Sequence, residues 1–274
     1  MTNFAATEPP GLSDVWAIGD AYEPFVGRWS RLVADEFIDW LGVPAGARWL
    51  DVGCGTGALM QTVLSRAAPA SVTGLDPSEG FLGYAQDRAK DPRAAFRLGD
   101  AQALPFADGA FEAVAAALVL NFIPAPALAV AEMKRVLRPG GTAAAYVWDY
   151  ADGMQPIRHF WDAATALDPA AEQLDEARRF PNCNPASLLS LFRDCGLDQV
   201  EDRIIEVPCV FRDFDDYWRP FLGGQGPAPT YCGTLSDERR ATLRDRLHAR
   251  LPIERDGSIR LTARAFAVRG IYPT

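Results

Sequence analysis

The 274-residue chain is predicted to form an α/β domain built on a mostly parallel sheet. Short apolar runs that suit buried strands alternate with segments whose apolar residues recur at helical spacing. The run at 111–118 is almost wholly apolar, as the central strands of parallel sheets are. Regular alternation of strand and helix places helices on both faces of such a sheet.

The first part of the chain contains the regular alternation. Apolar residues at spacings of three to five predict a helix within 20–41, after a loose tail at 1–14. Ser78 is the expected N-cap of a helix, and Pro139 with the two glycines after it ends another. The expected strands are 47–52, 70–76, 94–98, 111–118 and 142–148, and the expected helices are 56–66, 78–90 and 126–137.

The rhythm changes after Trp148. Prolines interrupt helical patches over 149–184, and residues 212–235 are rich in aromatics, glycine and proline. The two late strands are separated by an insertion and suit an antiparallel edge of the sheet. In chain order, the remaining expected elements are a helix at 186–195, a strand near 200–211, a helix at 236–250 and a strand at 258–268.

Composition and charge exclude several classes of protein. The formal net charge is −9, whereas nucleic-acid binding relies on basic residues that neutralise phosphates. Apolar runs fall short of the ~18–20 residues that cross a bilayer, and no secretory signal is evident. The five cysteines are scattered without a C-x-x-C pair, which argues against a zinc site or a disulfide framework. We expect a cytoplasmic protein with a small-molecule substrate, no metal, no nucleic-acid partner and no membrane span; monomer and homodimer both stay open.

The most informative segment runs from Trp49 to Ala58, where a predicted strand turns into a helix. Glycines at 53, 55 and 57 let the backbone adopt positive φ and pass close to a ligand, toward which the helix directs free N–H groups. A dinucleotide site usually has G-x-G-x-x-G spacing, whereas this corner has G-x-G-x-G. Asp51 at the strand tip repels a pyrophosphate and attracts an ammonium group. A dinucleotide site and a tight corner without a ligand are the alternatives.

The segment Asp51-Val52-Gly53-Cys54-Gly55-Thr56-Gly57 resembles motif I of class I S-adenosylmethionine (SAM) dependent methyltransferases. The likeness is to the small-molecule branch that includes ubiquinone/menaquinone-type methyltransferases. Segments 74–78, 99–106 and 136–141 agree with that family in order and spacing, so the resemblance covers about 45–150. It implies a Rossmann-like, seven-stranded sheet of order 3-2-1-4-5-7-6, with an antiparallel edge strand and helical lid insertions.

The resemblance also implies roles in holding SAM, or S-adenosylhomocysteine (SAH) as product. Motif I holds the methionine end, and Asp76, 19 residues beyond Gly57 and near the ~20 expected, accepts the ribose hydroxyls. Asp100 and Ala101 meet adenine, and Ala117 and Leu118 pass beside the sulfonium. Tyr22 and Arg28 reach the SAM carboxylate, although Arg28 is alternatively a solvated helix residue. The implied cofactor-binding residues are Tyr22, Arg28, Asp51, Gly53, Cys54, Gly55, Gly57, Asp76, Pro77, Asp100, Ala101, Ala117 and Leu118.

Methyl transfer from an activated donor needs little acid–base help, because orientation supplies roughly 7–11 kcal/mol of barrier lowering in favourable cases. Histidine titrates near neutral pH, which makes His159 a candidate base, although a lone histidine on a helix is often structural or exposed. Asp149 and Tyr150 follow the fifth strand at its carboxyl end, where ligands of such sheets gather. The catalytic candidates are His159, Asp149 and Tyr150, and the expected substrate contacts are Asn121, Trp148, Phe160 and Trp161.

The acceptor is the least specified part of the prediction. An excess of aromatic residues between Trp148 and Tyr231 suits an apolar or aromatic substrate, although core packing explains it equally well. We expect SAM-dependent methyl transfer to O, N or C of a small metabolite. The alternatives are an NAD(P)-dependent oxidoreductase and a SAM-fold protein repurposed for non-methylating catalysis or binding. The expected organisation is a tail with lid helices at 1–44 and a SAM-binding domain at 45–274, with cap insertions about 150–184 and 212–235.

Overall fold

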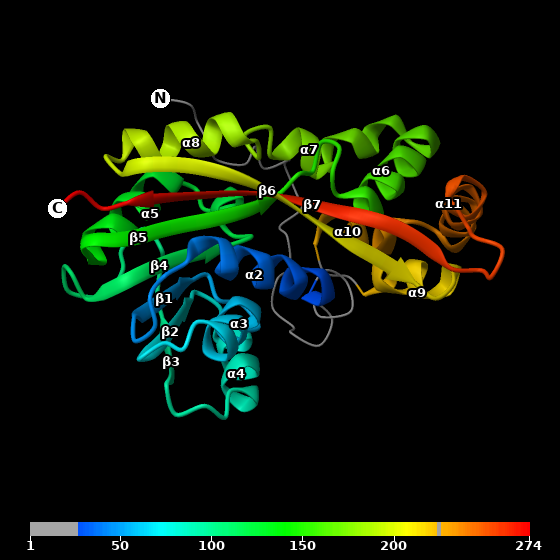
Figure 1. The fold of residues 1–274 in the computed structure, drawn as a ribbon. Coiled ribbons are helices and arrows are strands. Elements are labelled where there is room, and N and C mark those ends of the chain that lie inside the picture. Colours follow the sequence, from blue (N-terminus) through cyan, green and yellow to red (C-terminus); the bar gives the residue numbers. More distant parts are fainter. Residues whose placement is uncertain (1–26, 224–225) are drawn as a thin grey trace.

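The computed structural model describes residues 27–223 and 226–274, which contain a seven-stranded sheet of order β3-β2-β1-β4-β5-β7-β6 (Figure 1). The strands from β1 to β5 run parallel, and β7 is antiparallel to both β5 and β6. The predicted strand order and the antiparallel edge are therefore confirmed. The strands are β1 (Arg48–Val52), β2 (Ser71–Asp76), β3 (Ala94–Leu98), β4 (Phe111–Ala117), β5 (Leu137–Trp148), β6 (Asp198–Phe211) and β7 (Ile259–Ile271).

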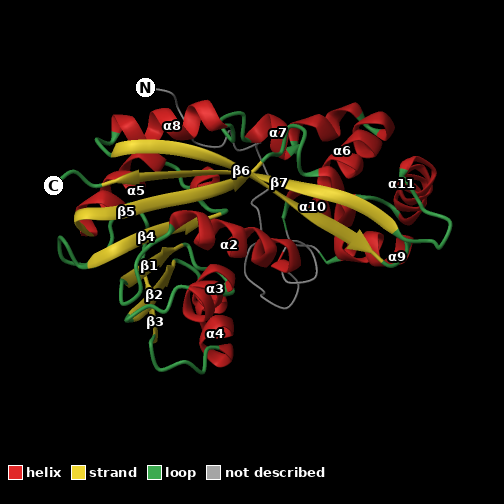
Figure 2. Cartoon of the chain, viewed as in Figure 1, coloured by secondary structure: helices red, strands yellow, loops and turns green. Residues whose placement is uncertain are grey.

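Helices cover both faces of this sheet (Figure 2). On one face lie α2 (Arg28–Leu41), α3 (Ala58–Arg66) and α4 (Glu79–Arg88), with α2 packed on α3 and on β6. On the other lie α5 (Pro126–Val136) and α8 (Pro185–Asp194), which pack on β4 and β5 and on β6 and β7 respectively. The Ser78 side chain accepts a hydrogen bond of 3.3 Å from the Phe81 N–H, which confirms the predicted N-cap of α4. Each helix among the described residues is too short or too polar to span a bilayer.

The fifth strand begins earlier than predicted. It starts at Leu137, directly after α5, so the proline and glycines at 139–141 lie inside the strand. A Cβ on Gly141 would lie 2.9 Å from the carbonyl oxygens of Arg138 and Glu112. The Gly141 carbonyl accepts a hydrogen bond of 2.9 Å from the Tyr272 N–H. Gly140 nevertheless has a φ of +78°, and the register between β4 and β5 shifts here, so the predicted turn is present as an irregularity inside the strand.

The core is centred on strands with small side chains. Leu50 on β1, Val114 on β4 and Ala145 on β5 are fully buried. β4 and β5 each contain a run of three alanines, at 115–117 and 143–145. Burial of apolar surface at roughly 25 cal/mol per Å² makes this the main stabilising contribution.

Two insertions form a second layer beside the extended ends of β6 and β7 (Figure 1). Phe160 stacks on Phe221 with ring centroids 4.5 Å apart, and the Tyr217 hydroxyl donates to the Pro156 carbonyl at 2.8 Å. These contacts join the two insertions, and we call their helices together the cap. It comprises α6 (Gln155–Leu167), η3 (Pro169–Gln173) and α7 (Glu176–Arg179), then α9 (Phe214–Trp218), η4 (Arg219–Leu222), α10 (Pro227–Thr234) and α11 (Asp237–Arg250).

Candidate active site

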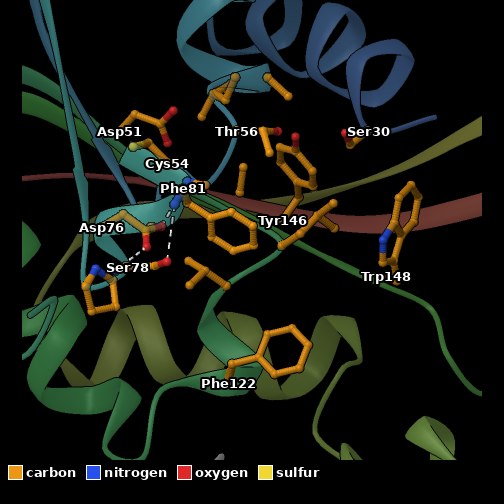
Figure 3. A pocket seen from close by; sticks show the side chains of 18 of the residues that line it. Ser30, Asp51, Cys54, Thr56, Asp76, Ser78, Phe81, Phe122, Tyr146 and Trp148 are labelled. Atoms are coloured by element: carbon orange, nitrogen blue, oxygen red, sulfur yellow. Dashed lines mark hydrogen bonds between the residues drawn. The ribbon is translucent and has the colours of Figure 1, made fainter. Parts of the chain in front are cut away.

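A cavity of about 250 Å³ lies at the carboxyl ends of the parallel strands (Figure 3). One part of its wall comes from the turns after β1 and β2, and another from the ends of β4 and β5. The cap contributes Ile157, Glu176 and Pro227. Ligands of doubly wound sheets bind at this edge, at the point where the strand order reverses between β1 and β4.

The turn from β1 into α3, residues 53–57, forms a glycine corner. Gly53, Gly55 and Gly57 have φ values of +70°, +51° and +87°, which side chains rarely tolerate. A Cβ on Gly53 would lie 2.5 Å from Val119 Cγ2, so this position also requires the absence of a side chain. The Gly53 N–H donates to the Leu75 carbonyl at 2.7 Å, which closes the corner onto β2.

Asp51 lies beneath this corner and is buried. Its Oδ2 accepts a hydrogen bond from the Met60 N–H at 3.1 Å, while its buried Oδ1 has no partner among the described residues. Burial raises the pKa of Asp51 to about 7; the Met60 N–H opposes this rise and the charge of Asp76 adds to it. The site therefore holds a carboxyl group that a nearby cation would return to its ionised form.

Asp76 ends β2 and joins two turns. Its Oδ2 accepts from the Gly55 N–H and its Oδ1 from the Ser78 N–H, both at 2.9 Å. Burial raises its pKa, while these two N–H groups favour the ionised form and limit the rise. Each oxygen of a carboxylate has capacity for a further hydrogen bond, so Asp76 can still accept from a ligand.

The end of β4 carries backbone strain. Leu118, which lines the cavity, has a φ of +58°, a conformation that costs a non-glycine residue roughly 1–2 kcal/mol. Its N–H donates to the Tyr146 carbonyl at 2.8 Å, which ties this turn to β5. Strained residues of this kind are concentrated at ligand sites. The turn continues into η2 (Leu120–Phe122).

Aromatic side chains surround the remaining part of the cavity. Tyr146 and Trp148 alternate with a residue between them on β5, so they lie on one face of the strand and line the cavity together with Phe122 (Figure 3). The ring of Phe180 contacts those of Phe122 and Tyr150, at centroid distances of 5.0 and 5.5 Å. This side of the site suits an apolar or aromatic molecule.

Glu176 introduces a carboxyl group into the aromatic part. It is buried, lines the cavity, and its Oε2 accepts a hydrogen bond from the Trp161 Nε1–H. Burial raises the pKa of Glu176 to about 8, against the opposing effect of hydrogen bonds from its own N–H and from Trp161. The carboxyl group therefore takes up and releases its proton close to pH 8, far above the acidic range of an ordinary glutamate.

The structure brings eight of the residues expected to bind the cofactor to the cavity wall and leaves others elsewhere. Asp100 accepts a 2.8 Å hydrogen bond from the Gln102 N–H outside the wall, and the Arg28 guanidinium lies over the rings of Trp29 and Phe211. Tyr22 lies outside the described residues. The expected residues that line the cavity are Asp51, Gly53, Cys54, Gly55, Asp76, Pro77, Ala117 and Leu118; Gly57, Asp100, Ala101 and Arg28 are not part of the described lining.

Among the catalytic candidates, Tyr150 lines the cavity, whereas Asp149 and His159 have other surroundings. Asp149 is buried and bonded to Arg264, with Oδ2 2.6 Å from Nη2, which ties the end of β5 to β7. Burial lowers the pKa of the half-buried His159, whose charged neighbours are Asp162 and Arg250.

Of the residues expected to contact the substrate, some line the cavity and others do not. Trp148 lines the cavity, whereas Phe160 and Trp161 are fully buried in the cap, where they pack on each other and on Tyr231. Asn121 is buried, and its amide atoms have no partner among the described residues. The structure thus gives Phe160 and Trp161 a place in the core of the cap.

Sequence reasoning missed several residues of the wall, notably Glu176, Tyr146 and Phe81. Tyr146 had a usable signal, because residues two apart in a strand share a face and Trp148 was already a candidate. No sequence signal pointed to Glu176, because it belongs to the charged segment Asp175-Glu176-Ala177-Arg178-Arg179. Such a segment is typical of a solvent-exposed helix. Its burial depends on packing between α7 and α6.

Comparisons with known proteins place the chain in a class. A family model described as a methyltransferase domain matches residues 50–145, which include the glycine corner and the ends of β1, β2 and β4. The fold, the cavity and this match together define a class I methyltransferase with a Rossmann-like sheet.

Relatives of known name narrow this class. The chain is 32% identical over 193 residues to the ubiquinone/menaquinone biosynthesis C-methyltransferase UbiE of Dinoroseobacter shibae, covering 65% of this chain and 76% of that protein. It is 42% identical over 114 residues to the demethylmenaquinone methyltransferase of Renibacterium salmoninarum, covering 42% of this chain and 45% of that protein. The chain belongs to the class I SAM-dependent methyltransferases and resembles the UbiE-type members, so its activity is methyl transfer to a small molecule. This assignment replaces the oxidoreductase alternative.

A solved structure shares the fold. The Haemonchus contortus phosphoethanolamine N-methyltransferase 2, in complex with phosphomonomethylethanolamine and SAH, aligns with a TM-score of 0.58 and 18% identity. The alignment covers 93% of this chain and 57% of that one. At this identity the likeness concerns the fold, and the acceptor has to be inferred from the cavity.

Proposed function

We propose that this methyltransferase transfers the methyl group of SAM to a small, apolar or aromatic acceptor held between the strand ends and the cap. The observation that carries the proposal is the two-part wall of the cavity. One part has buried carboxylates and a glycine corner, and the other has Phe122, Tyr146, Trp148 and Tyr150. Such a wall suits a polar donor on one side and an apolar acceptor on the other.

The residues of the glycine corner fit SAM. The buried and unpartnered Oδ1 of Asp51 is an acceptor for the ammonium of the methionine part, and Gly55, where a Cβ would have no atom within 4 Å, leaves room beside the corner for the ligand. Asp76 retains acceptor capacity for the ribose hydroxyls. SAM supplies a methyl group that is already activated on a sulfonium, so the protein's task is to orient the acceptor and exclude water.

The cap residues would cover the acceptor. Ile157 and Pro227 belong to different insertions, and both line the cavity with the rings of the β5 end. In this proposal Tyr150 and Trp148 contact the acceptor, whereas Asp149 and His159 support the surrounding structure. Water exclusion by these apolar side chains strengthens the electrostatic interactions inside the site.

Calorimetry with SAH and with NADH tests the donor half of the proposal. We expect saturable SAH binding and no NADH binding; the opposite result would remove the basis of the proposal. Transfer of a radiolabelled methyl group from SAM to a library of aromatic and apolar metabolites tests the acceptor half. Tight SAH binding with no labelled product from any member would instead favour a SAM-fold protein repurposed for another task.

A further inference from the structure

Among the described residues that line the cavity, Glu176 is the carboxyl group that the cap contributes. Asp51 and Asp76 lie at the ends of β1 and β2. Their carboxylate oxygens accept hydrogen bonds from backbone N–H groups in and next to the glycine corner. Glu176 accepts from a side chain of the cap, that of Trp161, in addition to its own N–H. Its position and its partner separate it from the carboxylates that we assign to the donor.

Helix α6 fixes Glu176 at the cavity wall. Arg158 of α6 donates to both carboxylate oxygens of Asp175, at 2.9 and 2.5 Å, and Asp175 caps α7 by accepting from the Ala177 N–H at 2.9 Å. One turn further along α6, Trp161 donates to Glu176 Oε2. A tryptophan N–H can only donate, so Oε2 acts as acceptor and Oε1 is the oxygen available for a proton.

The charges around Glu176 oppose each other in part. On its own helix Asp175 raises the pKa of the Glu176 carboxyl and Arg179 lowers it, while burial is the largest cause of its rise to about 8. Arg158 on α6 forms a salt bridge with Asp175, and Glu172 on η3 forms one with the exposed Arg178. A carboxyl group with a pKa close to the working pH is well matched to proton transfer.

We propose that Glu176 is a catalytic residue that hydrogen-bonds a hydroxyl group of the methyl acceptor and takes its proton during transfer. This inference rests on the proposed function and narrows the acceptor to a neutral aromatic or apolar molecule that carries a hydroxyl. The O–H bond breaks and its proton passes to the Glu176 carboxylate. The electron pair left on the oxygen forms the bond to the methyl carbon, and the pair of the broken S–C bond stays on sulfur. Glu176 then releases the proton to solvent.

Fluorescence of 2-naphthol bound to the SAH-loaded protein tests this proton transfer without turnover. The excited naphthol releases its proton to a neighbouring base, and the resulting naphtholate emits at longer wavelength. With the neutral probe excited, we expect about tenfold more naphtholate emission one pH unit above the Glu176 pKa of about 8 than one unit below it. Glu176→Gln keeps the shape of the side chain and an acceptor for Trp161, but it cannot take a proton, so the naphtholate emission should be lost at both pH values.

Two further variants test whether the emission depends on the Glu176 carboxyl group: one changes its pKa, and the other is a surface control. Trp161→Phe leaves the carboxyl in place but removes a donor that favours its ionised form, so the midpoint of the emission should move to higher pH. Glu172→Gln removes an exposed carboxyl of the same insertion and should behave as the wild type.

Naphtholate emission of wild-type strength in Glu176→Gln, an unmoved midpoint in Trp161→Phe, or failure of naphthol to bind the SAH-loaded protein would each overturn the inference. Calorimetry with SAH alone separates the two levels of the argument. Absence of SAH binding would defeat the proposed function itself, and with it this inference. SAH binding combined with any of the three results above would defeat the role of Glu176 alone.

Discussion

The two parts of the cavity wall are held in different ways. Around the glycine corner the backbone sets the shape, since both oxygens of Asp76 accept from N–H groups and Gly53 packs directly on Val119. In the cap, side chains set the shape, through ring contacts such as Phe160 on Phe221 and the bond from Trp161 to Glu176. A site fixed by backbone tolerates little change, whereas one fixed by side chains can be altered while the sheet stays intact.

Alanine substitutions in the corner should show the strongest effect and test how far the backbone alone sets this shape. Gly53→Ala combines positive φ with a Cβ 2.5 Å from Val119 Cγ2, so we expect the free energy of unfolding to fall by about 2–4 kcal/mol. Gly55→Ala has positive φ but no atom within 4 Å of its Cβ, so a loss of about 1 kcal/mol is expected. Denaturant unfolding of the ligand-free proteins measures both. Equal losses would show that the contact with Val119 contributes nothing.

Asp76→Ala tests the donor side by ligand binding. Loss of charge-assisted hydrogen bonds to the ribose should weaken SAH binding by roughly 1.5–3 kcal/mol, measured by calorimetry. Asp87→Ala, on the exposed surface of α4, is the matched control and should leave the affinity unchanged. An unchanged affinity in Asp76→Ala would mean that this carboxylate does not hold the ribose.

Glu176→Gln tests the cap part of the wall through the pH dependence of the free energy of unfolding. Because the folded-state pKa of about 8 lies above the ordinary 4.5, the folded protein binds more protons than the unfolded chain between these values. Stability should therefore fall with rising pH across this window, by up to about 1.4 kcal/mol per pH unit from this group. Glu176→Gln should remove that part of the slope, which denaturant unfolding at a series of pH values would reveal. An identical slope in the two proteins would contradict the burial of an ionisable group here.

Asp51 gives the corresponding pH effect on the donor side. An ammonium group requires the ionised form of Asp51, whose pKa in the free protein is raised to about 7. SAH affinity should therefore fall below that pH, by at most about tenfold per pH unit, as the carboxyl takes up a proton. Asp51→Asn should bind SAH weakly and without this pH dependence. A flat profile in the wild type would argue that Oδ1 does not meet the ammonium.

The part of the cavity wall around the glycine corner could be predicted from sequence because its determinants are close in the chain. The glycine corner, the acidic ends of β1 and β2 and the N-cap residue Ser78 of α4 each depend on neighbours within a few residues. The buried position of Glu176 at the cavity wall could not be predicted, since it depends on packing against α6. Phe160 and Trp161 were expected at the substrate for their aromatic character, yet the same character places them in the core of the cap. Residue type alone does not distinguish these two uses.

The connectivity of the cap has a consequence for the exchange of specificity. Its two insertions leave the sheet after Trp148 and after Phe211, and β6 separates them along the chain. The stacking of Phe160 on Phe221 nevertheless makes them one packing unit. Replacing one insertion with that of another methyltransferase would leave half of a matched apolar interface without its counterpart. A chimera with a new acceptor range would therefore need both segments grafted together.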